Sequence, residues 1–107
     1  MPVPEGGGLK KMAIYITLGK WTDKGIQSAK EAPKREQAAE EMAKQLGGKI
    51  YGFYITMGKY DFVAVSDFPD DEAIMRFSLG IGGQGNVRTT TMKAWTIADA
   101  AKVIGKL

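Results

Sequence analysis

A β-hairpin in the middle of the chain constrains the fold more than any other segment. Two runs of β-forming residues, Lys49 to Met57 and Tyr60 to Phe68, are separated only by Gly58 and Lys59. A two-residue loop with glycine first predicts a type II′ turn, because glycine accepts the positive φ that this turn requires. The loop fixes the register, and the predicted facing pairs are Met57 and Tyr60, Thr56 and Asp61, Ile55 and Phe62, Tyr54 and Val63, Phe53 and Ala64, and Gly52 and Val65. Apolar pairs therefore lie on both faces of the hairpin.

The part of the chain before the hairpin predicts one strand and a helical region. Met12 to Leu18 alternates in the manner of a strand. A helical region follows with Thr22 as its N-cap, and Pro33 interrupts it, so a short helix should lead into a longer one from about Pro33 to Leu46. The pair Gly47-Gly48 should end the longer helix.

The part after the hairpin predicts a helix, a strand and a terminal helix. Pro69 to Glu72 places acids at the positive end of a helix dipole, and the glycines between Gly80 and Gly85 should break that helix. Asn86 to Trp95 is rich in β-formers, and Thr96 begins a last helix with a capping-box-like spacing to Asp99. The order β-α-β-β-α-β-α predicts an α+β domain: a ferredoxin-like βαββαβ fold with a four-stranded antiparallel sheet and an extra C-terminal helix.

Two helices can cover only one face of such a sheet. Side chains alternate along a strand, so the aromatic residues of the strands cannot all point toward the helices. An uncovered apolar face would exceed the patch that soluble monomers usually expose. We therefore predict a homodimer, or a multiple of that dimer, in which two sheets face each other with Phe62 or Tyr15 at the interface.

The residue types that are missing exclude several chemistries. The 107 residues contain no cysteine and no histidine, which excludes disulfides, thiolate catalysis, His-based triads and His-ligated haem. We predict neither a cofactor nor a metal. The net charge is +3, but the basic residues are scattered and mostly interleaved with acids. This pattern argues against nucleic-acid binding, which needs a concentrated basic face.

Length and hydropathy predict one domain in the cytoplasm. A chain of 107 residues has room for one hydrophobic core. Residues 1–11 carry two prolines and three glycines and predict a flexible N-terminal arm, whereas residues 12–107 form the patterned domain. No apolar run approaches the ~20 residues that a membrane span needs, and the first residues lack the apolar middle of a secretory signal.

The glycine-rich segment Gly80 to Gly85 formally satisfies the dinucleotide-binding pattern G-x-G-x-x-G. That fingerprint requires a strand before it and a helix after it, and here the order is reversed. We therefore interpret the segment as a helix-to-strand connection, which could also form a lid over a pocket mouth.

Short motifs along the chain resemble those of the GYD-domain family. They are Tyr15 to Leu18, Trp21-Thr22 with Gly25-Ile26, Pro33 to Arg35, Gly47-Gly48, Thr56 to Phe62, Pro69 to Ala73, and Val87 to Thr91 through Ala94. The resemblance spans Met12 to about Thr96, and the Gly58-x-Tyr60-Asp61 signature gives the family its name. It implies a dimeric α/β barrel, in which two ferredoxin-like sheets face each other around a cavity, and it leaves the biochemical function open. The same superfamily includes cofactor-independent monooxygenases, isomerases and the ligand-binding domains of leucine-responsive regulators.

Three functional hypotheses follow. The first is a small-molecule-binding module with its cavity at the dimeric barrel or near the Gly58 to Asp61 turn; its candidate ligand-binding residues are Tyr15, Tyr54, Tyr60, Arg88 and Trp95. The second is a cofactor-independent oxygenase or isomerase acting on a small organic substrate, with Asp61 as the catalytic base. The third is a purely structural oligomeric module. Asp61 also has a structural interpretation, because a carboxylate beside a turn can accept hydrogen bonds from nearby backbone N–H groups.

Overall fold

A four-stranded antiparallel sheet with the strand order β2-β3-β1-β4 forms the centre of the molecule. This computed structural model describes residues 12–107, and the predicted arm of residues 1–11 lies outside the described residues. Along the chain the elements are β1 (Ala13–Trp21), α1 (Asp23–Gln27), the 3-10 helix η1 (Ala29–Glu31), α2 (Ala32–Gln45), β2 (Lys49–Ile55), β3 (Phe62–Phe68), α3 (Asp71–Gly83), β4 (Val87–Ala94) and α4 (Ile97–Ile104). This order confirms the predicted ferredoxin-like α+β fold with an additional C-terminal helix.

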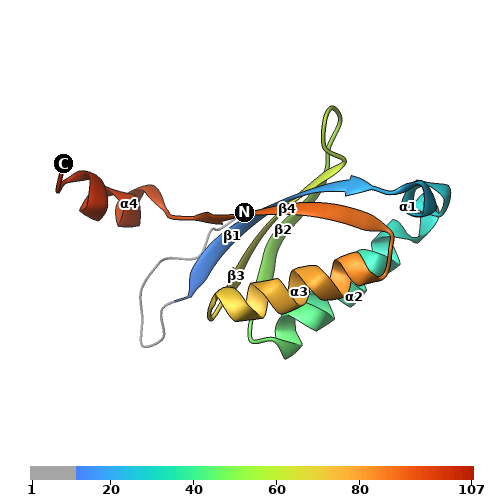
Figure 1. Ribbon diagram of the computed structural model, residues 1–107, viewed down its shortest axis with the longest axis horizontal. Helices are drawn as coiled ribbons and strands as arrows, with labels where there is room; N and C mark the ends of the chain where they lie inside the picture. The colour runs from blue at the N-terminus through green and yellow to red at the C-terminus, as the bar shows by residue number, and fades with distance from the viewer. Residues whose placement is uncertain (1–11) are drawn as a thin grey trace.

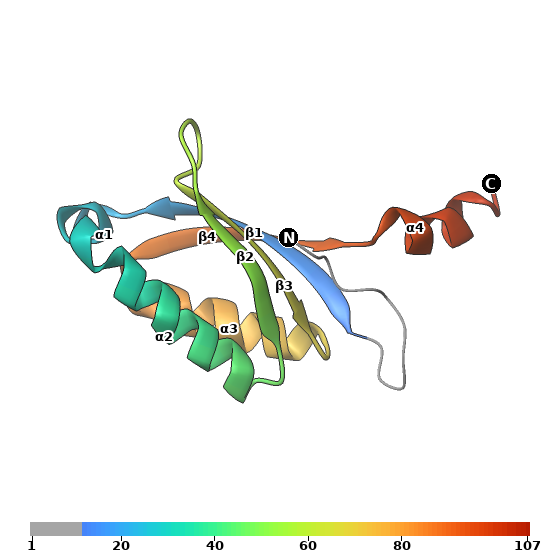
Figure 2. The same ribbon diagram turned by 180° about the vertical axis from the view of Figure 1, so that it is seen from behind.

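The long helices α2 and α3 lie side by side against one face of the sheet (Figures 1 and 2). The hydrophobic core fills the space between these helices and the sheet. Its buried members are Tyr15, Ala43, Phe68, Ala73, Ile74 and Phe77. Among the described residues, no helix combines the length and the apolar character needed to cross a bilayer.

The β2–β3 hairpin has the predicted register but a wider loop. Ile55 pairs with Phe62, and the pairs that follow along both strands are also the predicted ones as far as Gly52 and Val65. The strands end at Ile55 and Phe62 rather than at Met57 and Tyr60, and Gly58 has the expected positive φ of 114°. The strands separate early because the loop makes other contacts, which are described with the candidate site below.

A β-bulge interrupts the edge strand β2. Ile50 pairs with Ser66 and Gly52 with Val65, so Tyr51 is left without a facing residue on β3. The bulge reverses the alternation of side chains along the first part of β2. The predicted facing pairs ended at Gly52 and Val65, so this shift lies just beyond them.

Helix α3 continues through three of the glycines that were predicted to break it. Gly80 and Gly82 lie inside the helix and Gly83 is its last residue, so the predicted break was wrong. Ile81 packs against the hydrophobic core, which holds this turn of the helix despite a cost of about 1 kcal/mol per glycine. The chain reverses only at Gly85, where φ is +81°.

The predicted helix starts are confirmed. The Thr22 hydroxyl accepts a 3.1 Å hydrogen bond from Gly25 N–H, and the Thr96 hydroxyl accepts a 3.0 Å bond from Asp99 N–H. Pro33 stands in the first turn of α2, where a missing N–H costs no helical hydrogen bond. Helix α4 projects from the sheet at the end opposite α1 (Figure 1), and none of its residues is buried.

The sheet face opposite α2 and α3, here called the open face, is not covered by any helix or strand of the described chain (Figure 2). The strand registers place the following apolar residues on it: Ile14, Ile16, Leu18, Tyr54, Val63, Val65, Met92 and Ala94.

Tyr15 and Phe62 do not lie on this open face. Both point toward the helices: Tyr15 belongs to the core, and the ring of Phe62 lies directly under Gly19 on the same side. The prediction that one of them meets a partner sheet was therefore wrong. The prediction that side chains alternate between the two faces was correct. Alternation alone does not say which of the two faces the helices cover.

Candidate functional site

An apolar cavity of about 80 Å³ lies between the sheet and helices α2 and α3. Bulky side chains surround it, namely Trp21, Ile50, Phe53, Ile55, Phe62, Phe77, Ile81 and Val87. Its remaining walls are small or polar side chains, which are described next. The cavity is formed within a single chain.

Small side chains at facing positions create this cavity. Thr17 on β1 and Ala64 and Ser66 on β3 form the floor, and Ala39 on α2 and Ser78 on α3 face them. Protein interiors normally pack without such space. The chain therefore leaves a space that larger residues at these five positions would have filled.

The polar atoms of the floor are already satisfied. The Thr17 hydroxyl is 3.3 Å from that of Thr91, and the Ser66 hydroxyl donates to the carbonyl of Tyr15 at 3.5 Å. No buried side-chain nitrogen or oxygen of the described residues lacks a partner. The floor therefore behaves as an apolar surface.

Arg35 and Glu36, in the first turns of α2, bring charge to the cavity. The Arg35 guanidinium donates hydrogen bonds to the carbonyls of Gly25 and Ser28, both at 3.2 Å, and to the Ser28 hydroxyl at 3.0 Å. Burial, a hydrogen bond with Glu40 and the charge of Glu40 raise the pKa of Glu36 to about 6. The cavity wall therefore contains one immobilised cation, Arg35, next to one acid with a raised pKa, Glu36.

The signature turn is joined to the wall of this cavity. The Asp61 carboxylate accepts a 2.9 Å hydrogen bond from the backbone N–H of Trp21, a lining residue. The backbone of Asp61 makes two further bonds: its N–H donates to Gly19 O at 2.8 Å, and its carbonyl accepts from Thr56 N–H at 2.9 Å. All three bonds are structural, and they hold the hairpin loop against the end of β1.

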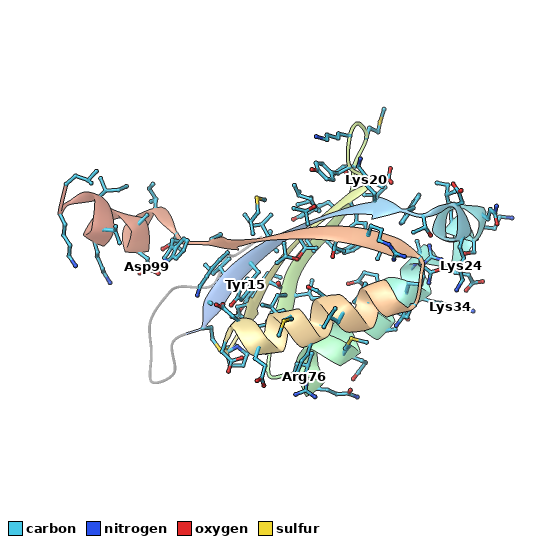
Figure 3. The ribbon with its side chains drawn as sticks, viewed as in Figure 1. Tyr15, Lys20, Lys24, Lys34, Arg76 and Asp99 are labelled. Carbon is cyan, nitrogen blue, oxygen red and sulfur yellow. The ribbon has the colours of Figure 1, made fainter. Side chains whose placement is uncertain are left out.

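Tyr60, the other signature residue, lies beside two cations. The ammonium groups of Lys20 and Lys59 are each 5.7 Å from its ring centroid. Figure 3 labels Lys20 on β1 beside the β2–β3 loop. The Tyr60 carbonyl also accepts a 2.7 Å hydrogen bond from the Thr56 hydroxyl.

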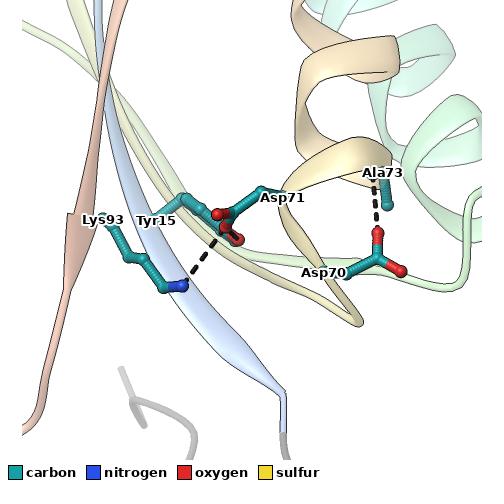
Figure 4. A network of polar contacts seen from close by, with 5 residues as sticks. All are labelled: Tyr15, Asp70, Asp71, Ala73 and Lys93. Atoms are coloured by element: carbon teal, nitrogen blue, oxygen red, sulfur yellow. Dashed lines mark hydrogen bonds and ion pairs between the residues drawn. The ribbon is translucent and has the colours of Figure 1, made fainter.

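Tyr15 takes part in a separate polar network at the other end of the sheet (Figure 4). Its hydroxyl donates to Asp71 Oδ1, which also contacts Lys93 Nζ at 3.2 Å. Burial and the adjacent Asp71 raise the pKa of Tyr15, whereas the hydrogen bonds from Tyr15 and Lys93 lower the pKa of Asp71.

The remaining predicted ligand-binding residues are dispersed. Tyr54 lies on the open face and is 49% exposed, and Trp95 follows β4 and is 59% exposed. Arg88 lies opposite Lys20 on the open-face side of β4 and donates to the carbonyls of Gly82 and Val87. Of the six predicted residues, Tyr60 and Asp61 lie next to each other in the hairpin loop, whereas Tyr15 lies at the other end of the sheet. No group of acidic residues in the described chain could hold a metal ion.

Sequence reasoning missed the residues that make the cavity. Neither Arg35 nor Glu36 was among the predicted site residues, and the small residues of the floor gave no separate signal. The signal available was the run of small side chains at alternating strand positions, Thr17 on β1 and Ala64 and Ser66 on β3.

These features define a class of protein: a ferredoxin-like α+β domain whose Gly-x-Tyr-Asp hairpin is anchored to β1. The sequence matches the GYD domain over residues 15–104. The chain belongs to the GYD-domain family.

Comparisons with individual proteins agree with this assignment. A relative from Thermus thermophilus, "Glutamine synthetase and cystathionine beta-lyase binding protein", is 30% identical over 89 residues, which cover 82% of this chain and 94% of the relative. A crystal structure of a protein from Thermus thermophilus is 25% identical, with a TM-score of 0.51 over 79% of this chain and 95% of that chain. The structure of MtbAldR has a TM-score of 0.60 at 12% identity over 78% of this chain. This chain spans about half of MtbAldR, at 52%, and that likeness concerns the fold alone.

Proposed function

We propose that this chain is a homodimeric binding module that pairs through its open sheet face and uses α4 to bind a second protein. The observation that carries the proposal is the distribution of exposed apolar side chains. Two regions carry several of them: Tyr54 and Met92 are exposed on the open face, and Ile97, Val103 and Ile104 are exposed on α4 beside Trp95.

The open face supports the pairing. Ile16 and Val65 face each other at its centre, with Leu18 and Val63 as the next pair. Burying such side chains returns about 25 cal/mol per Å² of apolar area. A twofold axis would let two copies cover the same surface on each other, as in the dimeric α/β barrel.

Helix α4 supports protein binding. It has only eight residues and no buried one, and Ile97 and Ile104 are 84% and 54% exposed. A helix this short is marginal in water without packing of its apolar face. The relative from Thermus thermophilus is named as a binding protein for two enzymes, and we infer that this chain also binds an enzyme.

Small-molecule binding between the paired sheets or near the Gly58 to Asp61 turn stays a prediction. Tyr54 would line the space between the sheets, because it lies on the open face. Catalysis with Asp61 as a base also stays a prediction, and an enzymatic assay of an Asp61→Asn variant would address it.

The pairing is tested by light scattering at micromolar concentration. We expect about twice the chain mass of 11.6 kDa, or a multiple of that dimer. Ile16→Glu should give a folded monomer, because a carboxylate cannot be buried unpaired between two sheets. Leu79→Glu is the control, since this exposed side chain lies on α3. A wild-type monomer would contradict the proposal.

Protein binding is tested by biolayer interferometry with purified glutamine synthetase and cystathionine beta-lyase from the organism that produces this chain. We expect at least one of them to bind. Replacing Ile97 and Ile104 together by serine should weaken binding, whereas Lys102→Ser, on the polar side of α4, should not. Failure of both enzymes to bind the wild-type dimer would overturn this part of the proposal.

A further inference from the structure

We propose that the cavity between the sheet and helices α2 and α3 binds a small monocarboxylate with a compact apolar body, and that Arg35 receives its carboxylate. This site lies inside one protomer, on the opposite side of the sheet from the proposed dimer interface. It is also distinct from α4, so the inference goes beyond the proposed function.

The walls define the body of the ligand. The rings of Phe53 and Phe62 are stacked with centroids 5.0 Å apart, and Phe77 lines the cavity from α3. The hydroxyls of Thr17 and Ser66 on the floor are already hydrogen-bonded. A ligand body here meets apolar atoms and aromatic rings, and a polar body would lose its hydrogen bonds to water without replacement.

Arg35 defines the other end of the ligand. Among the residues that the structure describes, no carboxylate lies within ion-pair distance of its guanidinium. Its three hydrogen bonds go to uncharged oxygens of Gly25 and Ser28. A guanidinium has five N–H donors, so it retains donors for a carboxylate and is held in place before the ligand arrives.

The neighbouring acids do not cancel the preference of Arg35 for a carboxylate. Glu36 also lines the cavity, and its pKa is raised to about 6 through burial and its hydrogen bond with Glu40. Below about pH 6, one proton held between these two carboxyl groups reduces the negative charge that an incoming anion meets. Tyr51, on β2, and Glu40 line the adjoining groove outside Glu36, and neither is a cation that could replace Arg35.

The size of the cavity limits the ligand. A volume of about 80 Å³ has room for roughly six water molecules, or for a molecule of about as many non-hydrogen atoms whose polar end extends toward the mouth. Benzoate is a suitable probe, because it combines one ring with one carboxylate. Benzamide has the same shape without the charge.

The experiment is a titration of the ¹⁵N-labelled full-length protein with benzoate, followed by NMR at a pH just below the Glu36 pKa of about 6, where benzoate is still ionised. We expect saturable shifts centred on lining residues such as Thr17, Ala64 and Ile81, and weaker binding of benzamide. Arg35→Met should weaken benzoate binding about tenfold while leaving benzamide binding nearly unchanged. Equal affinities of the wild-type protein for the two probes would overturn the role assigned to the carboxylate.

A second variant keeps the test independent of Arg35, which also anchors the start of α2. Ser78→Leu places a larger side chain in the cavity, so it should abolish benzoate binding and leave the protein folded, as judged by its NMR spectrum. Unchanged binding by Ser78→Leu would place the ligand elsewhere and overturn the proposal. Absence of saturable shifts in the wild-type protein with millimolar benzoate would also overturn it, whatever the mass of the oligomer.

Discussion

The backbone N–H of Trp21 donates a 2.9 Å hydrogen bond to the carboxylate of Asp61, which ties the end of β1 to the signature hairpin. Trp21 lines the cavity and Asp61 belongs to the turn between β2 and β3. The aspartate of the Gly-x-Tyr-Asp signature therefore positions a wall of the cavity through the backbone.

Removing this carboxylate should destabilise the fold. Asp61→Ala leaves the Trp21 N–H without its partner, and we expect the free energy of unfolding to fall by about 2 kcal/mol. Asp61→Asn keeps an acceptor oxygen but no charge, so its loss should be about half as large. Urea denaturation measures both. Equal stability of the alanine variant and the wild type would contradict the structural role of Asp61.

The Tyr15 hydroxyl should contribute more to stability than the ion pair that shares Asp71. Tyr15 is 3% exposed, and Tyr15→Phe removes its hydrogen bond while preserving the packing of the ring. Lys93 and Asp71 are both well exposed, and exposed ion pairs contribute little. We therefore expect a lower melting temperature for Tyr15→Phe than for Lys93→Met. The reverse order would show that the ion pair dominates this network.

Replacement by alanine should stabilise the protein at two glycines of one short segment and destabilise it at a third. A Cβ at Gly82 or Gly83 would meet no atom within 4 Å, and both residues are helical, so each alanine should stabilise the protein by about 0.5–1 kcal/mol. Gly85 has a φ of +81°, so Gly85→Ala should destabilise it. Thermal denaturation of the three variants tests this prediction, and stabilisation by Gly85→Ala would contradict it.

Glu36 should make stability depend on pH. Its pKa is about 6 in the folded protein against an ordinary 4.5, so the folded state binds the proton more tightly. Stability from this group is therefore complete below pH 4.5 and is lost as the pH rises through about 6. Glu36→Gln removes this loss of stability at high pH. Its free energy of unfolding at pH 7 should exceed that of the wild type by about 1 kcal/mol, which is less than the full pKa shift implies because solvent screens the charge.

The control for this prediction is Glu41→Gln, which replaces an exposed acid on the same helix. Unfolding free energies at pH 4 and pH 7 should differ between Glu36→Gln and the wild type only at the higher pH. A constant difference at both pH values would contradict the raised pKa.

The fold was predictable because its signals are local. The glycine of the hairpin turn fixed the pairing of Ile55 with Phe62, and threonine N-caps marked the starts of α1 and α4. The end of α3 was not predictable in this way, because the packing of Ile81 against the core outweighs the weak helix propensity of its glycine neighbours.

The candidate site was less predictable than the fold. Whether Tyr15 points toward the helices or away from them depends on which side of the sheet the helices cover, and alternation along a strand is the same in both cases. A cavity is also a property of several elements together: Thr17, Ala64 and Ser78 are ordinary small residues until three elements bring them face to face. The role of Arg35 was not predictable for the same reason, because its guanidinium is positioned by hydrogen bonds to Gly25 of α1 and to Ser28.

The bulge at Tyr51 has a consequence for how the sheet ends. Strand β2 is an edge strand, and a straight edge offers its free N–H and C=O groups to a strand of another molecule. The extra residue between Ile50 and Gly52 breaks the spacing of those groups at the first part of β2, so a regular strand cannot continue its hydrogen bonds along the whole edge. We expect this irregularity to hinder edge-to-edge growth of the sheet at its β2 edge.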